Sequence, residues 1–187
     1  QTRSSGAWLH FVSLEKHPLT PDDLSRALDL WPSLQTYTAK LLAKYPPLTA
    51  GWHRLFFAEE NLTLTLLLGD ANELLPELVA EVDVWFLDGF SPDKNPELWQ
   101  LNLLSSVAKL SKINSTLSTY SAAGVVKRTL EAAGFVVIKQ KGFGLKRNMT
   151  TATMTNKAPA SLSWLSRNTT HRSEQAKTAI VIGAGIA

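Results

Sequence analysis

Cysteine is absent from the 187 residues of the chain. Its absence excludes disulfide bonds, thiolate zinc sites and a cysteine nucleophile, and it is in keeping with a cytoplasmic protein. The histidines show no paired spacing typical of metal ligands, so the sequence predicts no metal site. No uninterrupted apolar run reaches the roughly 20 residues that a membrane-spanning helix requires. The chain also begins without the apolar stretch of a signal peptide, so we expect no association with a membrane.

Acidic residues are scarce in the last third of the chain. Residues 1–126 contain 9 Lys/Arg and 14 Asp/Glu, whereas residues 127–187 contain 10 Lys/Arg and 2 Asp/Glu. A basic end on an otherwise acidic protein indicates a polyanionic partner such as a nucleic acid. A solvated surface with a basic linker would have the same composition. The content of 44% hydrophobic and 19% charged residues is typical of a globular protein with a sizeable core.

Strand-like and helix-like segments alternate along most of the chain. An apolar run over about 8–14 predicts a strand, and Thr20 followed by Pro21 predicts the N-terminus of the next helix. The continuous apolar run before Asp88 predicts a strand buried on both faces of a parallel sheet. This alternation predicts an α/β fold with helices on both faces of the sheet. The last two strands, joined by a turn at 142–144, should be antiparallel.

The sequence divides into three parts. Residues 1–156 carry the alternating pattern, and residues 157–177 are polar and rich in serine and threonine, as is typical of a linker. Residues 178–187 begin a new apolar strand that ends in Gly183 and Gly185. These glycines fit the first two positions of a dinucleotide-binding fingerprint. We interpret this end as the start of a second domain, with a chance glycine-rich tail as the alternative.

Three acidic residues each end a predicted strand, and they are Glu15, Asp70 and Asp88. In open α/β sheets ligands bind at the carboxyl ends of the strands, where an acid can accept hydrogen bonds from ribose hydroxyls or lie beside an adenine. Each acid could instead cap the helix that follows it, and this alternative is strongest for Asp70. It is weaker for Glu15, because the next helix has its own cap in Thr20.

Asp88 differs from the other two acids because a stiff loop follows it. Gly89 lets the backbone approach a ligand, and Pro92 and Pro96 restrict the loop. A carboxylate held in this way suits a reacting amine, which it could orient or from which it could help accept a proton. Phe90 could pack on a base or ring, with core packing as the alternative.

A basic segment surrounds the turn at 142–144. Lys141, Lys146 and Arg147 lie beside glycines that would let backbone and side chains meet phosphate groups. A solvated hairpin is the alternative interpretation of these residues.

Five stretches of the sequence together resemble one known family. In chain order they are FVSLEKHPLT, LLLGDANELL, DVWFLDGFSPDKNPELW, STYSAAGVVKRTLEAAGF and KGFGLKRNM. They are similar to the methyltransferase domain of the bacterial bifunctional tRNA 5-methylaminomethyl-2-thiouridine biosynthesis proteins. The terminal AIVIGAGIA resembles the start of the FAD-dependent oxidoreductase domain of those proteins. The resemblance implies a class I S-adenosylmethionine-dependent methyltransferase fold, Rossmann-like, with an antiparallel C-terminal hairpin.

The resemblance also implies an activity. Such proteins transfer a methyl group from S-adenosylmethionine to the amine of 5-aminomethyl-2-thiouridine at the wobble position of certain tRNAs, and their FAD domain forms that amine by removing a carboxymethyl group. On this chain Glu15 would hold the cofactor ribose, Asp70 would lie at the adenine, and Asp88 would be the catalytic residue beside the methyl group and the amine. The contacts to tRNA would come from Phe90, Lys141, Lys146 and Arg147.

One part of the family pattern is missing from the sequence. Such domains have a strand and a glycine-rich loop before the ribose-binding acid, whereas this chain starts close to the strand that ends at Glu15. We therefore expect an N-terminally incomplete methyltransferase domain. A non-catalytic fragment that binds tRNA is the alternative to an active enzyme.

Overall fold

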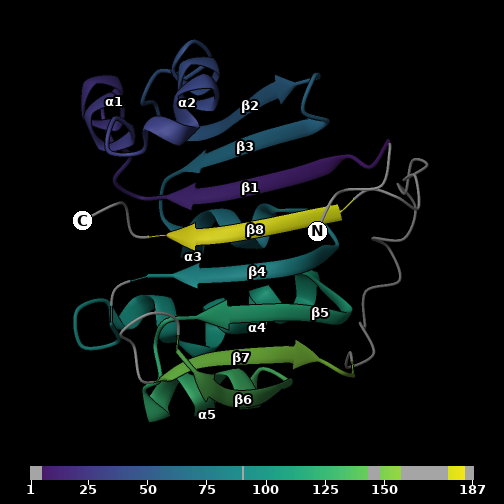
Figure 1. The fold of residues 1–187 in the computed structure, drawn as a ribbon. Coiled ribbons are helices and arrows are strands. Elements are labelled where there is room, and N and C mark those ends of the chain that lie inside the picture. Colours follow the sequence, from purple (N-terminus) through teal and green to yellow (C-terminus); the bar gives the residue numbers. More distant parts are fainter. Residues whose placement is uncertain (1–5, 90, 143–147, 157–176, 184–187) are drawn as a thin grey trace.

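The computed structural model describes residues 6–89, 91–142, 148–156 and 177–183. Their centre is one eight-stranded sheet in the order β2-β3-β1-β8-β4-β5-β7-β6 (Figure 1). The strands are β1 (Leu9–Glu15), β2 (Gly51–Phe57), β3 (Leu62–Leu68), β4 (Val82–Asp88), β5 (Ser111–Thr119), β6 (Phe135–Lys141), β7 (Asn148–Met154) and β8 (Lys177–Gly183). The α-helices are α1 (Pro21–Leu28), α2 (Gln35–Leu42), α3 (Ala71–Leu74), α4 (Leu101–Leu110) and α5 (Gly124–Ala132). Short 3-10 helices are η1 (Pro32–Leu34), η2 (Leu75–Glu77) and η3 (Pro96–Trp99). The predicted α/β class is confirmed.

The middle of the sheet is parallel. Strands β3, β1, β8, β4 and β5 all run in the same direction, so their carboxyl ends lie along one edge. Strand β2 is antiparallel to β3, and β7 is antiparallel to both β5 and β6. The predicted antiparallel pairing of β6 with β7 is therefore confirmed. Because β6 points the same way as β5, it also ends at the edge where the parallel strands end.

Helix boundaries follow the local chemistry of the sequence. The Thr20 hydroxyl accepts a hydrogen bond from the backbone N–H of Asp23 at 3.2 Å, and Pro21 is the first residue of α1, as predicted. Gly134 follows α5 with a φ of +103°, a conformation that favours glycine, and leads directly into β6. Trp99 ends η3 and is buried in the core.

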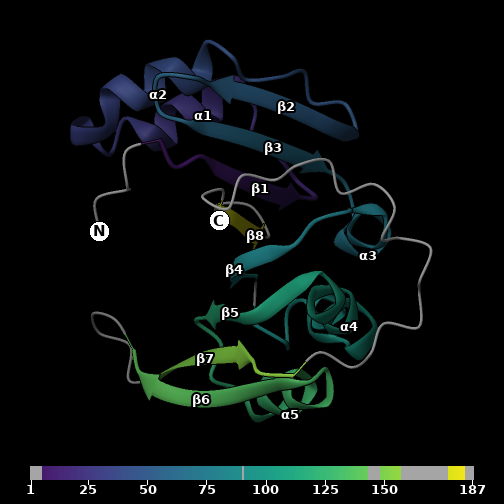
Figure 2. The same ribbon diagram turned by 90° about the vertical axis from the view of Figure 1, so that its right-hand side faces the viewer.

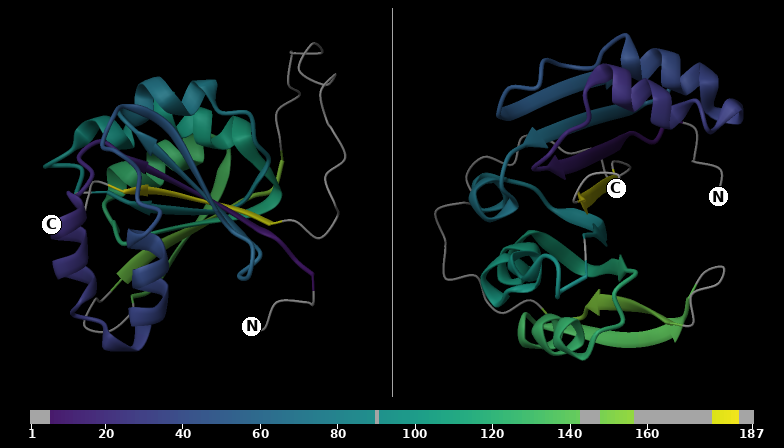
Figure 3. Two further views of the ribbon diagram at one scale, coloured as in Figure 1. Left: turned by 90° about the horizontal axis from the view of Figure 1, so that it is seen from above. Right: turned by 90° about the vertical axis from the view of Figure 1, so that its left-hand side faces the viewer.

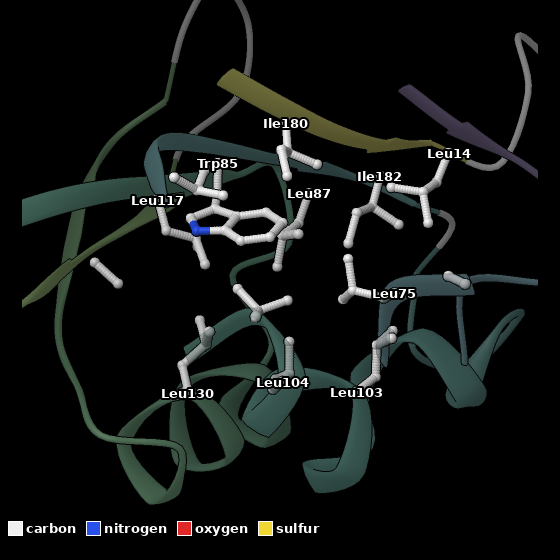
Figure 4. Packing of buried hydrophobic residues seen from close by; sticks show 14 of the residues in the cluster. Leu14, Leu75, Trp85, Leu87, Leu103, Leu104, Leu117, Leu130, Ile180 and Ile182 are labelled. Atoms are coloured by element: carbon white, nitrogen blue, oxygen red, sulfur yellow. The ribbon is translucent and has the colours of Figure 1, made fainter. Parts of the chain in front are cut away.

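The hydrophobic core lies between the sheet and helices α3, α4 and α5, whereas α1 and α2 lie on the other face beside β2 and β3 (Figures 2 and 3). Trp85 of β4 is fully buried, and its indole N–H donates to the Ser111 hydroxyl at 2.9 Å. Figure 4 shows Trp85 packed among leucine and isoleucine side chains.

One prediction about β4 is wrong. The apolar run suggested burial on both faces, but Trp85 and Leu87 are buried while Phe86 between them is 43% exposed. The reason is that α1 and α2 cover only the β2–β3 end of their face, so no described helix lies over β4 on that side (Figure 2). The second half of the strand, from Trp85 to Asp88, therefore has one buried face and one exposed face.

Strand β8 lies in the middle of the sheet, between β1 and β4 and parallel to both (Figure 1). Its side chains Ile180 and Ile182 belong to the same core as Trp85. The sequence suggested that residues 178–187 begin a second domain after a linker at 157–177. The structure adds that the first strand of that segment is part of the central sheet in this chain, and the division into domains stays a prediction.

Candidate functional site

The carboxyl edge of the sheet brings three predicted site residues together. Glu15 is the last residue of β1 and Asp88 is the last residue of β4. Gly183 ends β8 between them and is the pairing partner of Asp88. Asp70 follows Gly69 directly after β3, whose last residue pairs with Glu15. The three acids that the sequence singles out therefore lie along one edge, where ligands bind in open α/β sheets.

Glu15 is half-buried at this edge. The Ser13 hydroxyl donates to its Oε1 at 3.4 Å. Burial, and next the negative charge of Glu15, raise the pKa of the Tyr45 phenol, which donates to the carbonyl of Leu19 at 3.0 Å. Glu15 is thus a partly shielded carboxylate in polar surroundings, a setting that suits hydrogen bonds to the two vicinal hydroxyls of a ribose.

Asp70 caps helix α3, which is the alternative that the sequence left open for it. Its Oδ1 accepts from the backbone N–H of Asn72 at 2.9 Å, and its Oδ2 accepts from the Lys16 ammonium at 2.8 Å. The hydrogen bond from Lys16, and then the one from the Asn72 backbone, lower the pKa of Asp70. The same pairing raises the pKa of Lys16. A role for Asp70 at the adenine stays a prediction.

Asp88 is exposed, and its carboxylate contacts no donor among the residues that the structure describes. The loop behind it is ordered by a tight turn, in which the Ser91 carbonyl accepts from the backbone N–H of Lys94 at 2.8 Å. Gly89 is packed against Leu98, whose Cδ1 would lie 2.6 Å from an added Cβ. A side chain at this position would have to displace the end of the Leu98 side chain, and the glycine lets the loop and Leu98 pack closely behind Asp88.

Of the predicted tRNA-binding residues, Lys141 lies within the described part of the chain. It is the last residue of β6 and is exposed. Strand β6 lies three positions from β4 in the sheet, which places Lys141 about 15 Å along the edge from Asp88. The remaining predicted residues lie outside the described ranges, and they are Phe90, Lys146, Arg147 and Gly185.

The edge contains residues that the sequence interpretation missed. Lys16 is the partner of Asp70 across two strands, and only the pairing of β1 with β3 reveals it. Strand β5 also ends at this edge, where the Ser121 carbonyl accepts from the Thr150 hydroxyl at 2.7 Å and Tyr120 is 53% exposed. The rule that pointed to the acids, polar residues at the carboxyl end of a parallel strand, would also have found Tyr120 and Ser121.

An apolar pocket of about 330 Å³ lies elsewhere, between α2 and the β2–β3 hairpin. Its lining is almost entirely apolar, and none of the three acids contributes to it. The edge site is therefore distinct from this pocket. Among the described residues no group of three or more His, Cys, Asp or Glu side chains could hold a metal ion. None of the helices in the described ranges is both long enough and apolar enough to cross a membrane.

Comparison with known proteins gives one consistent family. The sequence model of a family described as S-adenosyl-L-methionine-dependent methyltransferase matches residues 32–155, a range that includes Asp70, Asp88 and Lys141. The chain is 46% identical over 185 residues to the tRNA 5-methylaminomethyl-2-thiouridine biosynthesis bifunctional protein MnmC of Chromobacterium violaceum. It is 49% identical over 182 residues to the protein of the same name from Ectopseudomonas mendocina. These matches cover 98% and 97% of this chain but only 28% and 27% of those two proteins.

A solved structure supports the same fold. The crystal structure of MNMC2 from Aquifex aeolicus matches with a TM-score of 0.57 and 26% identity, over 81% of this chain and 55% of that chain. The family model spans the segments from η1 to β7, which carry two of the three edge acids. The chain therefore belongs to the family of S-adenosyl-L-methionine-dependent methyltransferases.

Proposed function

We propose that the protein methylates the amine of 5-aminomethyl-2-thiouridine at the wobble position of tRNA and so forms 5-methylaminomethyl-2-thiouridine. The observation that supports this most is the placement of Glu15, Asp70 and Asp88 along the carboxyl edge of a methyltransferase sheet. The names of the relatives from Chromobacterium violaceum and Ectopseudomonas mendocina supply the substrate class. Because the chain spans about 28% of the first of those proteins, the activity of the whole protein belongs to the proposal.

The residues of the edge fit S-adenosylmethionine by their chemistry. Glu15 would accept hydrogen bonds from the ribose hydroxyls, since a half-buried carboxylate at the end of a parallel strand can engage both of them. Asp70 holds the start of α3 beside the edge through its hydrogen bonds to Asn72 and Lys16. The start of α3, fixed in this way, would contribute to adenine binding as much as the Asp70 side chain itself.

In the proposed reaction, Asp88 is the residue that interacts with the substrate amine. When bound, S-adenosylmethionine would supply an electrophilic methyl group: the lone pair of the neutral amine would form the new N–C bond, the electrons of the C–S bond would stay on sulfur, and the proton released from the nitrogen would pass to solvent. An alkylamine is mostly protonated near neutral pH, since its ordinary pKa is close to the roughly 10.4 of lysine. The exposed carboxylate of Asp88 would accept a hydrogen bond from the amine, orient it and stabilise the positive charge that develops on nitrogen.

The tRNA would lie along the same edge. Lys141 is exposed there, and residues 127–187 carry a large excess of Lys/Arg over Asp/Glu. Phosphate contacts from such residues position a nucleic acid without reading its sequence. Lys146 and Arg147 stay predicted contacts of the same kind, as does Phe90 for a base. The flavin-dependent removal of a carboxymethyl group stays a prediction for the longer protein.

The test compares two aspartates of the same loop. The 187-residue chain is incubated with S-adenosylmethionine and tRNA that carries 5-aminomethyl-2-thiouridine, and the nucleosides are analysed by mass spectrometry. We expect Asp88→Asn to lower the rate by roughly 10²- to 10⁴-fold, the range that a positioned acid or base contributes. Asp93→Asn is the matched control, because Asp93 is an exposed turn residue with no described partner, and it should retain the rate within about twofold.

The outcomes separate the proposal from its alternative. Equal rates for Asp88→Asn and the parent chain would refute the role of Asp88. Tight binding of tRNA without any methylation by the parent chain would favour the non-catalytic, tRNA-binding alternative.

A further inference from the structure

We propose that Tyr120, which directly follows β5, is a substrate-recognition residue whose ring stacks on the wobble base while Asp88 interacts with the amine. The inference rests on the proposed function for the identity of the substrate. It adds a base contact from the strand next to β4, whereas the sequence interpretation assigned such a contact only to Phe90, in the loop after Asp88.

Tyr120 lies beside Asp88 at the carboxyl edge of the sheet. Strands β4 and β5 are parallel neighbours, and Leu87 of β4 pairs with Thr119, the last residue of β5. Continued by one residue, this register places Tyr120 opposite Asp88. Because neighbouring strands are about 4.8 Å apart, the two residues extend from adjacent backbones.

The two side chains also lie on the same side of the sheet. Side chains alternate between the two faces along a strand, and Leu87 and Thr119 are each only 5% exposed. The residues that follow them are exposed, since Asp88 lies at the open end of β4 and Tyr120 is 53% exposed. The carboxylate and the aromatic ring therefore lie together on the side that faces away from the core.

Hydrogen bonds on both sides of Tyr120 fix its backbone. The Thr119 hydroxyl accepts from the backbone N–H of Ser121 at 3.2 Å, and the Ser121 carbonyl accepts from the Thr150 hydroxyl at 2.7 Å. Thr119 and Thr150 are both buried, and they pair with each other across β5 and β7. A half-exposed aromatic ring on such a fixed backbone loses little conformational freedom when a ligand covers it.

The surroundings of Tyr120 suit a base rather than a phosphate group. Residues 113–126 contain no charged side chain, so this segment offers no cationic side chain to an anion. An aromatic ring can stack on a base of any sequence, because every base has a π face. Phosphate groups of the tRNA would instead meet Lys141, which lies further along the same edge.

Stacking on Tyr120 would bring the reacting amine to Asp88. The amine is joined to the base through a single carbon atom, and the carboxylate extends from the neighbouring strand. The ring would hold the base equally well before and during the methyl transfer. A contact of this kind lowers KM and leaves kcat nearly unchanged.

Steady-state kinetics of the 187-residue chain test the contact. The substrate is tRNA that carries 5-aminomethyl-2-thiouridine. We expect Tyr120→Ala to raise the KM for this tRNA roughly tenfold, as for the loss of one stacked base, and to change kcat by less than about threefold. Tyr120→Phe retains the ring and should keep KM within about twofold of the parent value.

Phe56→Ala is the matched control for the loss of an exposed aromatic ring. Phe56 is 56% exposed, and it lies on β2 opposite Thr63, near the amino end of β3. This position is remote from the carboxyl edge, so the variant should have the KM of the parent.

A second measurement does not depend on catalysis. Anticodon stem-loop RNA with 5-iodouridine at the wobble position is irradiated in the presence of the chain, because this photoreactive base couples preferentially to an aromatic ring that stacks on it. Mass spectrometry of the peptides then identifies the coupled residue. We expect the crosslink at Tyr120, its loss in Tyr120→Ala, and its retention in Tyr120→Phe and Phe56→Ala.

The two measurements separate this contact from the proposed function. If the parent methylates tRNA but Tyr120→Ala keeps the parent KM, or if the crosslink forms at another residue, the inference fails and the proposed function stands. If Tyr120→Phe loses as much as Tyr120→Ala, the hydroxyl acts rather than the ring, and stacking is refuted. A crosslink at Tyr120 without any methylation would refute the proposed function alone, and the absence of both would refute both.

Discussion

The Asp70 side chain is engaged on both of its oxygens, one by the start of α3 and the other by Lys16. The carboxylate of Asp88, by contrast, is exposed and accepts no hydrogen bond from the residues that the structure describes. The two acids differ because one precedes a helix whose N–H groups need an acceptor and the other precedes a turn that satisfies its own backbone. At the residue scale, Asp70 shapes the edge and Asp88 is the acid that is available to a substrate.

The state of Asp70 should make stability depend on pH at the acid end. Its pKa is lowered in the fold, so its contribution is present above the unfolded pKa of roughly 3.9 and is lost as the pH falls through the lower folded value. We expect Asp70→Asn to reduce the free energy of unfolding near pH 6 and to weaken its decline below about pH 4. Asp70→Ala should cost about 1 kcal/mol for the lost cap alone.

Urea denaturation between pH 3 and pH 7 measures both effects. Asp29→Asn is the control, because Asp29 is an exposed aspartate outside the edge. A parallel pH dependence of the parent chain and Asp70→Asn would show that the hydrogen bonds of Asp70 contribute nothing to stability.

At the element scale, the second half of β4, from Trp85 to Asp88, alternates between buried and exposed residues. Trp85 is fully buried and hydrogen-bonded to Ser111, whereas Phe86 is 43% exposed. We expect Trp85→Ala to lower the free energy of unfolding by about 3–5 kcal/mol, because it leaves a large cavity and removes the hydrogen bond that the Ser111 hydroxyl accepts from the indole. Phe86→Ala should cost less than about 1 kcal/mol. Chemical denaturation compares the two, and similar losses would mean that the open face of β4 is covered in solution.

The elements differ in how far the sequence could predict them. Helix α1 was predictable because Thr20, Pro21 and Asp23 act within one turn. The burial of β4 was not, because it depends on which face the distant helices α1 and α2 cover. The place of β8 was not predictable either, since the pattern TAIVIG fits any central parallel strand. Which strands become its neighbours is decided by contacts far apart in the chain.

At the scale of the whole molecule, the residues of the candidate site also differ in whether the sequence could predict them. The three acids were predictable because each ends an apolar run, and parallel strands bring such ends to one edge. Lys16 was not, because its partner Asp70 lies more than fifty positions away and is brought beside it by the pairing of β1 with β3. The molecule is thus two parts of a sheet joined by β8, with the acids on both sides of the junction and Lys141 further along the same edge.

The positive charge of Lys141 at this edge should affect the binding of tRNA. We expect affinity to fall with rising salt, because cations that contact phosphates displace counterions. Lys141→Ala should weaken binding a few-fold and lower the slope of log affinity against log salt by about one, as for the loss of one phosphate contact. Lys109→Ala is the matched control, since Lys109 lies near the end of α4, just before β5 begins, and so at the opposite edge of the sheet. Fluorescence anisotropy with labelled tRNA over a range of salt concentrations measures both variants. Equal slopes for Lys141→Ala and Lys109→Ala would place the tRNA away from the carboxyl edge and would separate tRNA binding from the acids that are proposed to carry out the methyl transfer.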